Sequence, residues 1–238
     1  MKKTKLALVT GGGVRVGAAI CRALADAGYT LIVHANRSIQ KAQQLAGQLG
    51  GVAIQGDLRS KAGVDQLFCE VDKVDGELMV LVNSAAIFES AEPHDVDSTI
   101  WENHIALNLS APFWCAQSAY KRFGEAGGSI VNVIDIAALR PEPGYVHYSA
   151  TKAGLIALTR GLAQSWAPAV RVNGVSPGPV LIPEHYDEAQ RKGWIDNLPM
   201  RDKLGPTDVA ETVRFLVDGP QGITGEIITV DGGWTTRV

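Results

Sequence analysis

Short apolar runs alternate along this chain with longer amphipathic stretches, and this alternation limits the possible folds more than any other feature. The apolar runs are rich in Val, Leu and Ile and cover residues 6–10, 30–36, 52–55, 78–83, 129–135, 170–176 and 226–232. Such nearly continuous runs are typical of strands that are buried on both faces of a sheet. Helical patterns lie between them, for example over 17–27, 39–49, 61–74 and 146–166. We therefore expect an α/β fold in which right-handed crossovers connect the strands of a parallel sheet.

Length and charge narrow the class of protein further. The chain has 238 residues, which suits one domain over 1–238. Its formal net charge is −3 and its longest basic run is Lys2–Lys3, so we expect no nucleic-acid partner and no membrane-surface patch. Three widely spaced cysteines, Cys21, Cys69 and Cys115, indicate reduced thiols and a cytoplasmic protein. No apolar run approaches the roughly eighteen residues of a membrane span, and the first apolar segment is better interpreted as a strand than as a targeting signal.

A glycine-rich turn, "TGGGVRVG", follows the first predicted strand. Its glycines are Gly11, Gly12, Gly13 and Gly17. Glycines at such a joint let the backbone turn sharply and approach a pyrophosphate, which the helix N-terminus then stabilises. A strict G-x-G-x-x-G motif does not fit, because Arg15 and Val16 stand within the turn. A plain glycine-rich turn is the alternative, but its position at the first strand–helix joint favours nucleotide binding.

The end of the second predicted strand bears on the choice of nucleotide. Sites that prefer NAD usually place an acidic residue there, whereas this chain has Asn36, Arg37 and Ser38. Arg37 could pair with a 2′-phosphate, and Ser38 could donate a hydrogen bond to it. We therefore predict NADP(H), with a solvated surface Arg37 as the alternative. After the third strand, Asp57 could accept from an adenine amine or cap the next helix, for which Ser60 is an equally good candidate.

Two residues on one predicted helix face, Tyr148 and Lys152, have the spacing of a catalytic pair. A lysine ammonium beside a phenol lowers the pKa of the phenol, so that it can exchange protons near neutral pH. Asp135 ends an apolar run thirteen residues before the tyrosine. Its carboxylate would raise the pKa of Tyr148 and oppose the lysine, so we expect a coupled set that keeps a proton available. Capping of a loop N–H is the alternative role for Asp135.

Several motifs together resemble the short-chain dehydrogenase/reductase family. They are the glycine turn, "VNSAA", "ALNLSAPF", YxxxK, "PGPV" and "ITGEIITVDGG", and they cover essentially the whole chain. The resemblance implies a single Rossmann-like, doubly wound domain with about seven parallel strands and helices on both faces. It also implies a catalytic set of Asn, Ser, Tyr and Lys, carried here by Asn108, position 135, Tyr148 and Lys152.

Two departures from the family pattern point to one branch of it. Position 135 is Asp where most members have Ser, and position 15 is Arg where most have Gly. The same two changes occur in the pteridine reductase branch, which the chain resembles most. That branch also has an Arg-Ser pair, matched by Arg37–Ser38, and an aromatic residue that stacks on the pterin, matched by Phe88.

The resemblance implies NADPH-dependent reduction of a C=N bond in a pterin or a dihydrofolate-type substrate. Tyr148, assisted by Asp135, would supply the proton, and Asn108 would hold a water or a backbone link in a proton relay. Phe88 would sandwich the substrate against the nicotinamide, unless it is a core aromatic, and Arg15 would reach toward the phosphates and the pterin. The implied cofactor-binding residues are Gly11, Gly13, Arg15, Val16, Gly17, Asn36, Arg37, Ser38, Asp57, Leu58, Asn83, Ala85, Lys152, Pro177, Gly178 and Val180.

Two other functions remain open at this point. The first is a ketone reductase of the same family, acting on a 3-oxoacyl thioester or a sugar, and the second is a non-catalytic NADP(H) sensor. The long, Pro-rich stretch 177–205 is expected to be a substrate loop that closes over the site. Relatives commonly form homotetramers through helices that correspond to 101–124 and 146–166, and we expect the same here.

Overall fold

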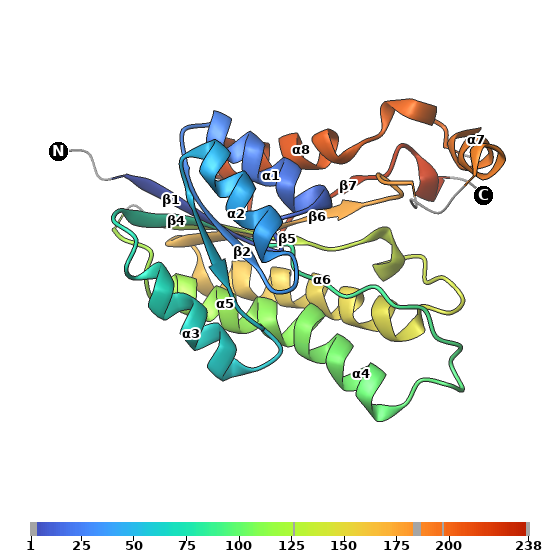
Figure 1. Cartoon of the computed structure of the whole chain (residues 1–238), viewed down its shortest axis with the longest axis horizontal. Coiled ribbons are helices and arrows are strands. Elements are labelled where there is room, and N and C mark those ends of the chain that lie inside the picture. The colour runs from blue at the N-terminus through green and yellow to red at the C-terminus, as the bar shows by residue number, and fades with distance from the viewer. Residues whose placement is uncertain (1–3, 126, 183–186, 197, 237–238) are drawn as a thin grey trace.

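One seven-stranded parallel sheet forms the centre of the computed structural model, which describes residues 4–125, 127–182, 187–196 and 198–236 (Figure 1). The strands are β1 Lys5–Thr10, β2 Thr30–Ala35, β3 Val52–Gln55, β4 Glu77–Asn83, β5 Gly128–Val133, β6 Val170–Pro177 and β7 Ile227–Val230. Their order is β3-β2-β1-β4-β5-β6-β7, and every neighbouring pair is parallel. The predicted doubly wound sheet is confirmed.

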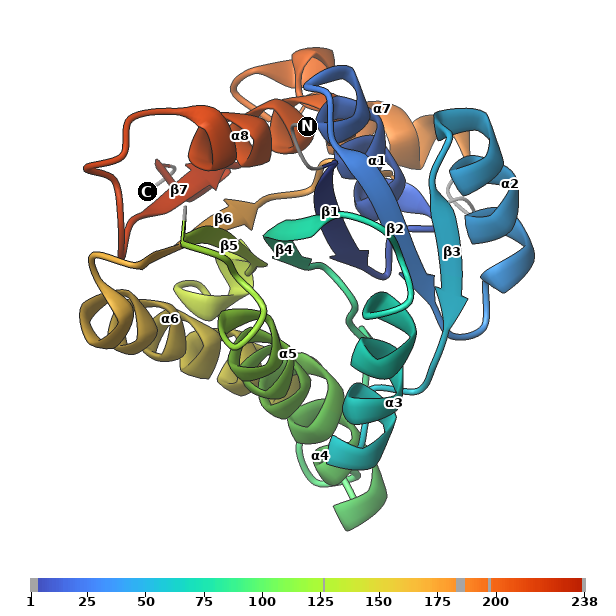
Figure 2. The same cartoon turned by 90° about the vertical axis from the view of Figure 1, so that its left-hand side faces the viewer.

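Helices cover both faces of the sheet, as the sequence predicts. They are α1 Arg15–Asp26, α2 Ile39–Leu49, α3 Lys61–Val71, α4 Ser98–Ile105, α5 Ala111–Tyr120, α6 Val146–Trp166, α7 Glu188–Asp196 and α8 Pro206–Asp218. Helices α1, α2 and α8 lie on one face, while α3, α5 and α6 lie on the other (Figures 1 and 2). A π-helical turn, Ala106–Ser110, connects α4 to α5. None of the described helices is both long enough and apolar enough to cross a bilayer.

The core consists of two apolar layers, one on each side of the sheet. Neighbouring residues of β1 show why the apolar runs are continuous. Val9 packs in the layer under α1, α2 and α8, whereas Leu8 packs in the layer under α3, α5 and α6. Both side chains are fully buried. Because successive strand residues point to opposite faces, a strand covered on both sides needs an apolar residue at nearly every position.

The strand order reverses between β1 and β4, and this places the site. From β1 the chain proceeds through β2 and β3 to one edge, and from β4 it proceeds through β5 and β6 to β7 at the other edge. In open α/β sheets the crevice beyond the carboxyl ends of the strands at such a reversal is where ligands bind. The glycine-rich turn after β1 and the "NSAA" segment after β4 both lie at this point.

Two segments near the C-terminus differ in detail from expectation. The last strand ends at Val230 because the Asp231 carboxylate accepts the N–H groups of Gly233 (2.9 Å) and Thr235 (2.8 Å) and so turns the chain. The stretch 177–205 is not wholly irregular, since it contains α7 and a 3₁₀ turn, Arg201–Lys203. Within it, residues 183–186 and 197 lie outside the described part of the chain. Its closure over the site stays a prediction.

Candidate active site and cofactor cleft

The glycine-rich turn is held in direct backbone contact with the segment after β4. Gly11 has φ +65, a left-handed conformation, and a Cβ there would lie 2.8 Å from the Cα of Ala85. A Cβ on Gly17 would lie 2.3 Å from the carbonyl oxygen of Gly11. The Thr10 hydroxyl accepts the N–H groups of Ser84 (3.0 Å) and Ala85 (3.1 Å) and ties the two segments together. The two loops are therefore packed directly against each other at the carboxyl ends of β1 and β4.

Arg15 has an unusual backbone at the start of α1. Its φ is +54, in the left-handed region that favours glycine, the residue expected in most family members. Its side chain is exposed and makes no hydrogen bond or ion pair within the described residues. The neighbouring Val16 is half-buried, and Gly13 packs against α2, where a Cβ would lie 3.1 Å from that of Ala42. Arg15 therefore occupies a strained position with a free guanidinium.

A buried histidine that sequence reasoning missed, His34, accepts a hydrogen bond from the glycine-rich turn. The Gly11 N–H donates to Nδ1 of His34 (3.4 Å), while Nε2 of the same ring lies 3.1 Å from the Gly56 carbonyl oxygen. One neutral tautomer satisfies both contacts, because the carbonyl requires a donor at Nε2. Burial lowers the pKa of His34 to about 4. The signal in the sequence was a histidine inside an otherwise apolar strand.

The corner after β2 is rich in hydrogen-bond donors. Asn36 and Arg37 are exposed, and the Arg37 guanidinium has no ion-pair partner among the described residues. Ser38 precedes α2, yet its hydroxyl makes no capping bond, and the first turn of α2 carries no acidic residue. A free guanidinium, a free hydroxyl and a helix N-terminus together suit an anionic group.

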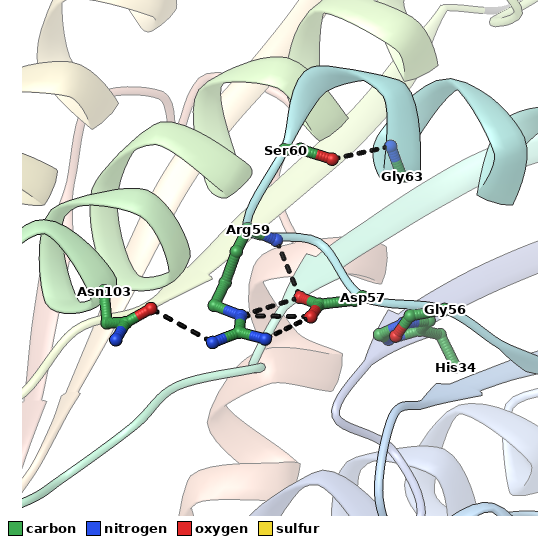
Figure 3. Close-up of polar contacts among 7 residues, drawn as sticks. All are labelled: His34, Gly56, Asp57, Arg59, Ser60, Gly63 and Asn103. Atoms are coloured by element: carbon green, nitrogen blue, oxygen red, sulfur yellow. Dashed lines mark hydrogen bonds and ion pairs between the residues drawn. The ribbon is translucent and has the colours of Figure 1, made fainter. Parts of the chain in front are cut away.

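Asp57 is engaged by a neighbouring arginine (Figure 3). The Arg59 backbone N–H donates to Oδ1 of Asp57 (3.0 Å), and Nη2 of Arg59 donates to Oδ2 (2.6 Å). These hydrogen bonds lower the pKa of Asp57. Arg59 also donates to Oδ1 of Asn103 on α4 (3.0 Å). Ser60 rather than Asp57 caps α3, because its hydroxyl accepts the N–H of Gly63 (3.1 Å), so the capping alternative for Asp57 is wrong.

Two predicted cofactor residues have side chains that serve the core instead. The Asn83 amide is buried and donates to Oδ1 of Asn132 (2.9 Å) and to the carbonyl oxygen of Pro112 (3.3 Å). The Leu58 side chain is buried in the layer under α3. Any contact that these positions make with a cofactor must therefore come from the main chain. The sequence could not show this, because Asn83 ends β4 and Leu58 lies three residues after β3, at the edge where cofactor residues were expected.

The residues predicted after β6 lie at the carboxyl end of that strand. Pro177 is its last residue and pairs with Val230 of β7. The Gly178 N–H donates to the Val230 carbonyl oxygen (2.9 Å), and a Cβ on Gly178 would lie 2.6 Å from that of Asp231. Val180 is buried against the apolar layer under α1 and α8. Gly178 thus keeps the chain close to the sheet edge at this end of the cleft.

The predicted proton-transfer residues lie close together between the end of β5 and the start of α6. Tyr148 and Lys152 stand one turn apart on α6, and Asp135 follows β5. The Tyr148 hydroxyl donates to Oδ2 of Asp135 (2.9 Å), and the Lys152 ammonium donates to the Val133 carbonyl oxygen (2.9 Å). Oδ1 of Asp135 accepts the N–H of Ala137 (2.8 Å) and caps a 3₁₀ turn. One carboxylate oxygen therefore caps a loop N–H while the other contacts Tyr148, and a role of Asp135 in proton transfer stays a prediction.

Burial is the largest cause of the pKa shifts of Asp135, Tyr148 and Lys152. It raises the pKa of Asp135, against the hydrogen bonds from Ala137 and Tyr148. Burial and the Asp135 charge hold the pKa of Tyr148 well above its ordinary range. Burial also lowers the pKa of Lys152 to about 8. The sequence predicts opposing effects of Lys152 and Asp135 on the pKa of Tyr148, and in the folded chain burial and the Asp135 carboxylate prevail.

Asn108 lies in the π-helical turn and binds the main chain of the segment after β4. Its Oδ1 accepts the N–H of Ile87 (2.9 Å), and its Nδ2 donates to the carbonyl oxygen of Ile87 (2.9 Å). The side chain is buried. These bonds join Asn108 to the main chain of Ile87, and its predicted part in a proton relay stays a prediction. π-Helical turns are rare and frequently occur at functional sites.

Phe88 lies beside Tyr148 and is not a core aromatic. Its side chain is 57% exposed. Its ring stacks on that of Tyr145, with centroids 4.2 Å apart and planes within 4°, and meets the Tyr148 ring edge-on at 4.8 Å. Tyr145 was missed by sequence reasoning, although its position three residues before Tyr148 was a usable signal. An exposed aromatic surface thus adjoins the proton donor.

Comparison with known proteins agrees with this architecture. A family model described as enoyl-(acyl carrier protein) reductase matches residues 13–235. The 3-oxoacyl-[acyl-carrier-protein] reductase FabG of Staphylococcus aureus is 32% identical over 98% of this chain and 99% of that protein. The solved FolM alternative dihydrofolate reductase 1 of Brucella suis, in complex with NADP, has a TM-score of 0.90 at 30% identity, covering 99% and 96% of the two chains. Its Brucella canis counterpart, also complexed with NADP, has a TM-score of 0.90 at 32% identity, covering 99% and 95%.

The fold, the tyrosine–lysine pair on α6 and these matches define an oxidoreductase. The chain belongs to the short-chain dehydrogenase/reductase family, as its motifs indicated. Members of this family use NAD(P)H. Two of the solved structures that the chain resembles are alternative dihydrofolate reductases, and a third is a putative short-chain alcohol dehydrogenase from Sinorhizobium meliloti, with a TM-score of 0.89 at 30% identity. The similar Staphylococcus protein is a 3-oxoacyl reductase.

Proposed function

We propose that this chain is an NADPH-dependent reductase of a C=N bond in a pterin or dihydrofolate-type ring. The observation that carries the proposal is the 2.9 Å hydrogen bond from the Tyr148 hydroxyl to the Asp135 carboxylate. A carboxylate beside the proton donor can also accept from an N–H group of a substrate ring. A pterin offers such N–H groups, whereas a simple ketone does not. Serine, the usual family residue at this position, would instead suit a carbonyl oxygen.

The chain's own geometry fits NADP(H), which would supply a hydride when bound. A Cβ on Gly11 or Gly17 would collide with backbone atoms, so this turn keeps the open main chain that a pyrophosphate needs. Arg37 and Ser38 would hold the 2′-phosphate, since both have free donors and no acidic residue follows in the first turn of α2. Lys152 would bind the nicotinamide ribose.

In the proposed reaction Tyr148 supplies the proton. Reduction of a C=N bond adds a hydride to carbon and a proton to nitrogen, so one O–H bond of the enzyme must break. Because the pKa of Tyr148 is raised, its hydroxyl is protonated at neutral pH and can donate. The Lys152 ammonium can balance the phenolate that remains, and Asp135 can hold a second N–H of the ring. Phe88 would stack on the substrate, and Arg15 would reach its electron-rich edge.

A second candidate is reduction of a ketone such as a 3-oxoacyl thioester. The similarity to FabG over nearly the whole chain supports it, and the same cofactor residues would serve. Asp135 and Arg15 disfavour it, and so does the similarity to the Brucella alternative dihydrofolate reductases.

The deciding experiment follows the loss of NADPH absorbance with dihydrobiopterin, dihydrofolate and an acetoacetyl thioester in parallel. Turnover of a pterin or folate without the thioester is expected. Turnover of the thioester alone would contradict the proposal and leave only the ketone reductase. NADH lacks the 2′-phosphate that Arg37 and Ser38 would hold, so it serves as a control. Turnover with NADH should be much slower than with NADPH.

We further propose a cytoplasmic homotetramer. Exposed aromatic side chains on the helices that the family uses for assembly, Trp101 on α4 and Tyr120 on α5, support such an interface. Three free cysteines suit a reducing compartment. Light scattering on the purified protein tests the assembly, and a monomeric mass would contradict it.

A further inference from the structure

Two buried histidines contact each other between α4 and α6, and the mechanism above does not use them. His104 is 0% exposed and His147 is 2% exposed. Their ring centroids lie 4.3 Å apart with planes at 88°. His104 stands four residues before Asn108 on one continuous helical run, and His147 directly precedes Tyr148. Each histidine therefore shares a helix with a proposed catalytic residue.

Hydrogen bonds to carbonyl groups fix the orientation of both rings. Nδ1 of His104 lies 2.8 Å from the Ile100 carbonyl oxygen, and Nε2 of His147 lies 2.9 Å from the Glu89 carbonyl oxygen. A carbonyl accepts only, so each of these nitrogens carries the hydrogen. The other nitrogens, Nε2 of His104 and Nδ1 of His147, are buried without a hydrogen-bond partner in the described chain. The pair is therefore a rigid contact between two helices.

The carbonyl that His147 holds belongs to the segment that carries Phe88. Asn108 binds Ile87 through both its N–H and its carbonyl group, at 2.9 Å each. His147 binds the next residue but one, Glu89, from a different helix. Phe88 lies between the two anchored residues, and its ring reaches Tyr145 and Tyr148.

Phe88 needs such anchors because burial cannot fix it. A ring that is 57% exposed gains little from packing. The segment around it has no strand or helix of its own. Its main chain is instead fastened by side chains from α6 and the π-helical turn, and the Ala91 N–H donates to the Gly144 carbonyl oxygen (2.9 Å). The position of the exposed ring thus depends on hydrogen bonds to its neighbours in sequence.

We infer that His147, supported by His104, is a positioning residue that fixes Phe88 for stacking against the flat ring of the substrate. Together with Asn108, these histidines form a clamp on residues 87–89. This inference rests on the proposed function, because stacking matters only for a planar substrate. Within the clamp, the two histidines act on substrate binding and not on proton transfer, since neither is a partner of the Asp135 or Tyr148 hydrogen bonds.

Two variants of His147 separate positioning from general stability. His147→Leu removes the donor to Glu89, whereas His147→Gln keeps an N–H donor at a similar reach. For the leucine variant we expect the KM for dihydropterin to rise about tenfold, with kcat and the Kd for NADPH within about twofold. The glutamine variant should recover most of the lost affinity. In a Phe88→Leu background, the effect of His147→Leu should fall below about twofold, because both changes act on one contact.

Hydrogen exchange gives a readout that needs no substrate. The amides of Ile87 and Ala91 are expected to exchange faster in His147→Leu, while those of the central strands keep their protection. An unchanged KM, an undiminished effect in the Phe88→Leu background, or faster exchange throughout the sheet would each overturn the clamp. If the wild-type protein reduces no pterin, the proposed function fails, and the exchange measurement still decides whether His147 anchors this segment.

Discussion

At residue 135 a single carboxylate makes both of the contacts that the sequence offered as alternatives. One oxygen accepts the Ala137 N–H and starts a 3₁₀ turn, while the other accepts the Tyr148 hydroxyl. The bond to Ala137 orients the carboxylate, and its second oxygen is thereby placed against the Tyr148 hydroxyl. A serine in its place could still cap the turn, because serine is a good N-cap residue. The two functions can therefore be separated by substitution.

Asp135→Ser should fold normally but lose pterin reduction. We expect kcat for dihydropterin to fall by about 100-fold, the usual order for an assisted proton transfer. The Kd for NADPH should stay within about twofold, which steady-state kinetics and cofactor titration together would show. Pterin turnover at the wild-type rate would disprove the role given to Asp135.

Arg15 has a backbone conformation that is unfavourable for a residue with a side chain. A left-handed residue with a Cβ costs about 1–2 kcal/mol relative to glycine. Strain of this kind persists at functional sites, where the side chain is needed. The φ of +54 therefore supports a functional reason for the arginine.

Arg15→Gly should raise the free energy of unfolding by about 1 kcal/mol and lower kcat/KM by about tenfold. Arg15→Ala is the matched control, because it loses the guanidinium but keeps the strained backbone. Urea unfolding and steady-state kinetics measure the two effects. Equal stability of the two variants would show that residue 15 carries no strain.

At the scale of elements, close approach of backbones decides which glycines matter. Gly17 lies in α1, where an added Cβ would stand 2.3 Å from the Gly11 carbonyl oxygen. Gly47 lies in α2, where an added Cβ would meet nothing within 4 Å. Both are glycines in helices, yet only at Gly17 does the lack of a side chain allow the helix to pack closely against the glycine-rich turn.

Gly17→Ala should destabilise the protein by about 1–3 kcal/mol, since backbone must move to make room, and should weaken NADPH binding. Gly47→Ala should stabilise it by about 0.5–1 kcal/mol, because alanine loses less entropy in a helix. Denaturant unfolding and cofactor titration of the pair test this. Similar changes in both variants would mean that packing at the turn is looser than the structure shows.

For the whole molecule, the buried His34 links the first and third strand ends and makes stability depend on pH. Its pKa falls from 6.5 to about 4 in the folded protein. Between these values the unfolded chain binds a proton that the folded chain does not, so stability is lost as pH falls through this window. The full effect amounts to about 3 kcal/mol.

His34→Gln should flatten the pH dependence of unfolding between pH 6.5 and 4. The variant is expected to be less stable than wild type at neutral pH, because the Gly11 N–H loses its acceptor, but to lose less stability on acidification. Urea unfolding at several pH values measures both. Parallel curves for variant and wild type would show that another group carries the acid sensitivity.

Much of the site could be predicted because its residues follow strand ends in a regular order. The Gly11–Gly17 turn, the Arg37–Ser38 corner and the Tyr148–Lys152 pair all lie where their local patterns placed them. His34 and the His104–His147 contact could not be predicted, since their partners are 22 or more residues away. The packing of the Asn83 and Leu58 side chains into the core could not be predicted either.

The sequence by itself determined the parallel sheet, the helices between its strands and the edge at which the site forms. These depend on apolar periodicity and turn residues, which are local properties of the chain. Only the tertiary structure decided which way Asn83 points, that the proton of Tyr148 is held rather than released, and what anchors Phe88. Desolvation and hydrogen bonding depend on groups that folding brings together from distant parts of the chain, and no local pattern records them.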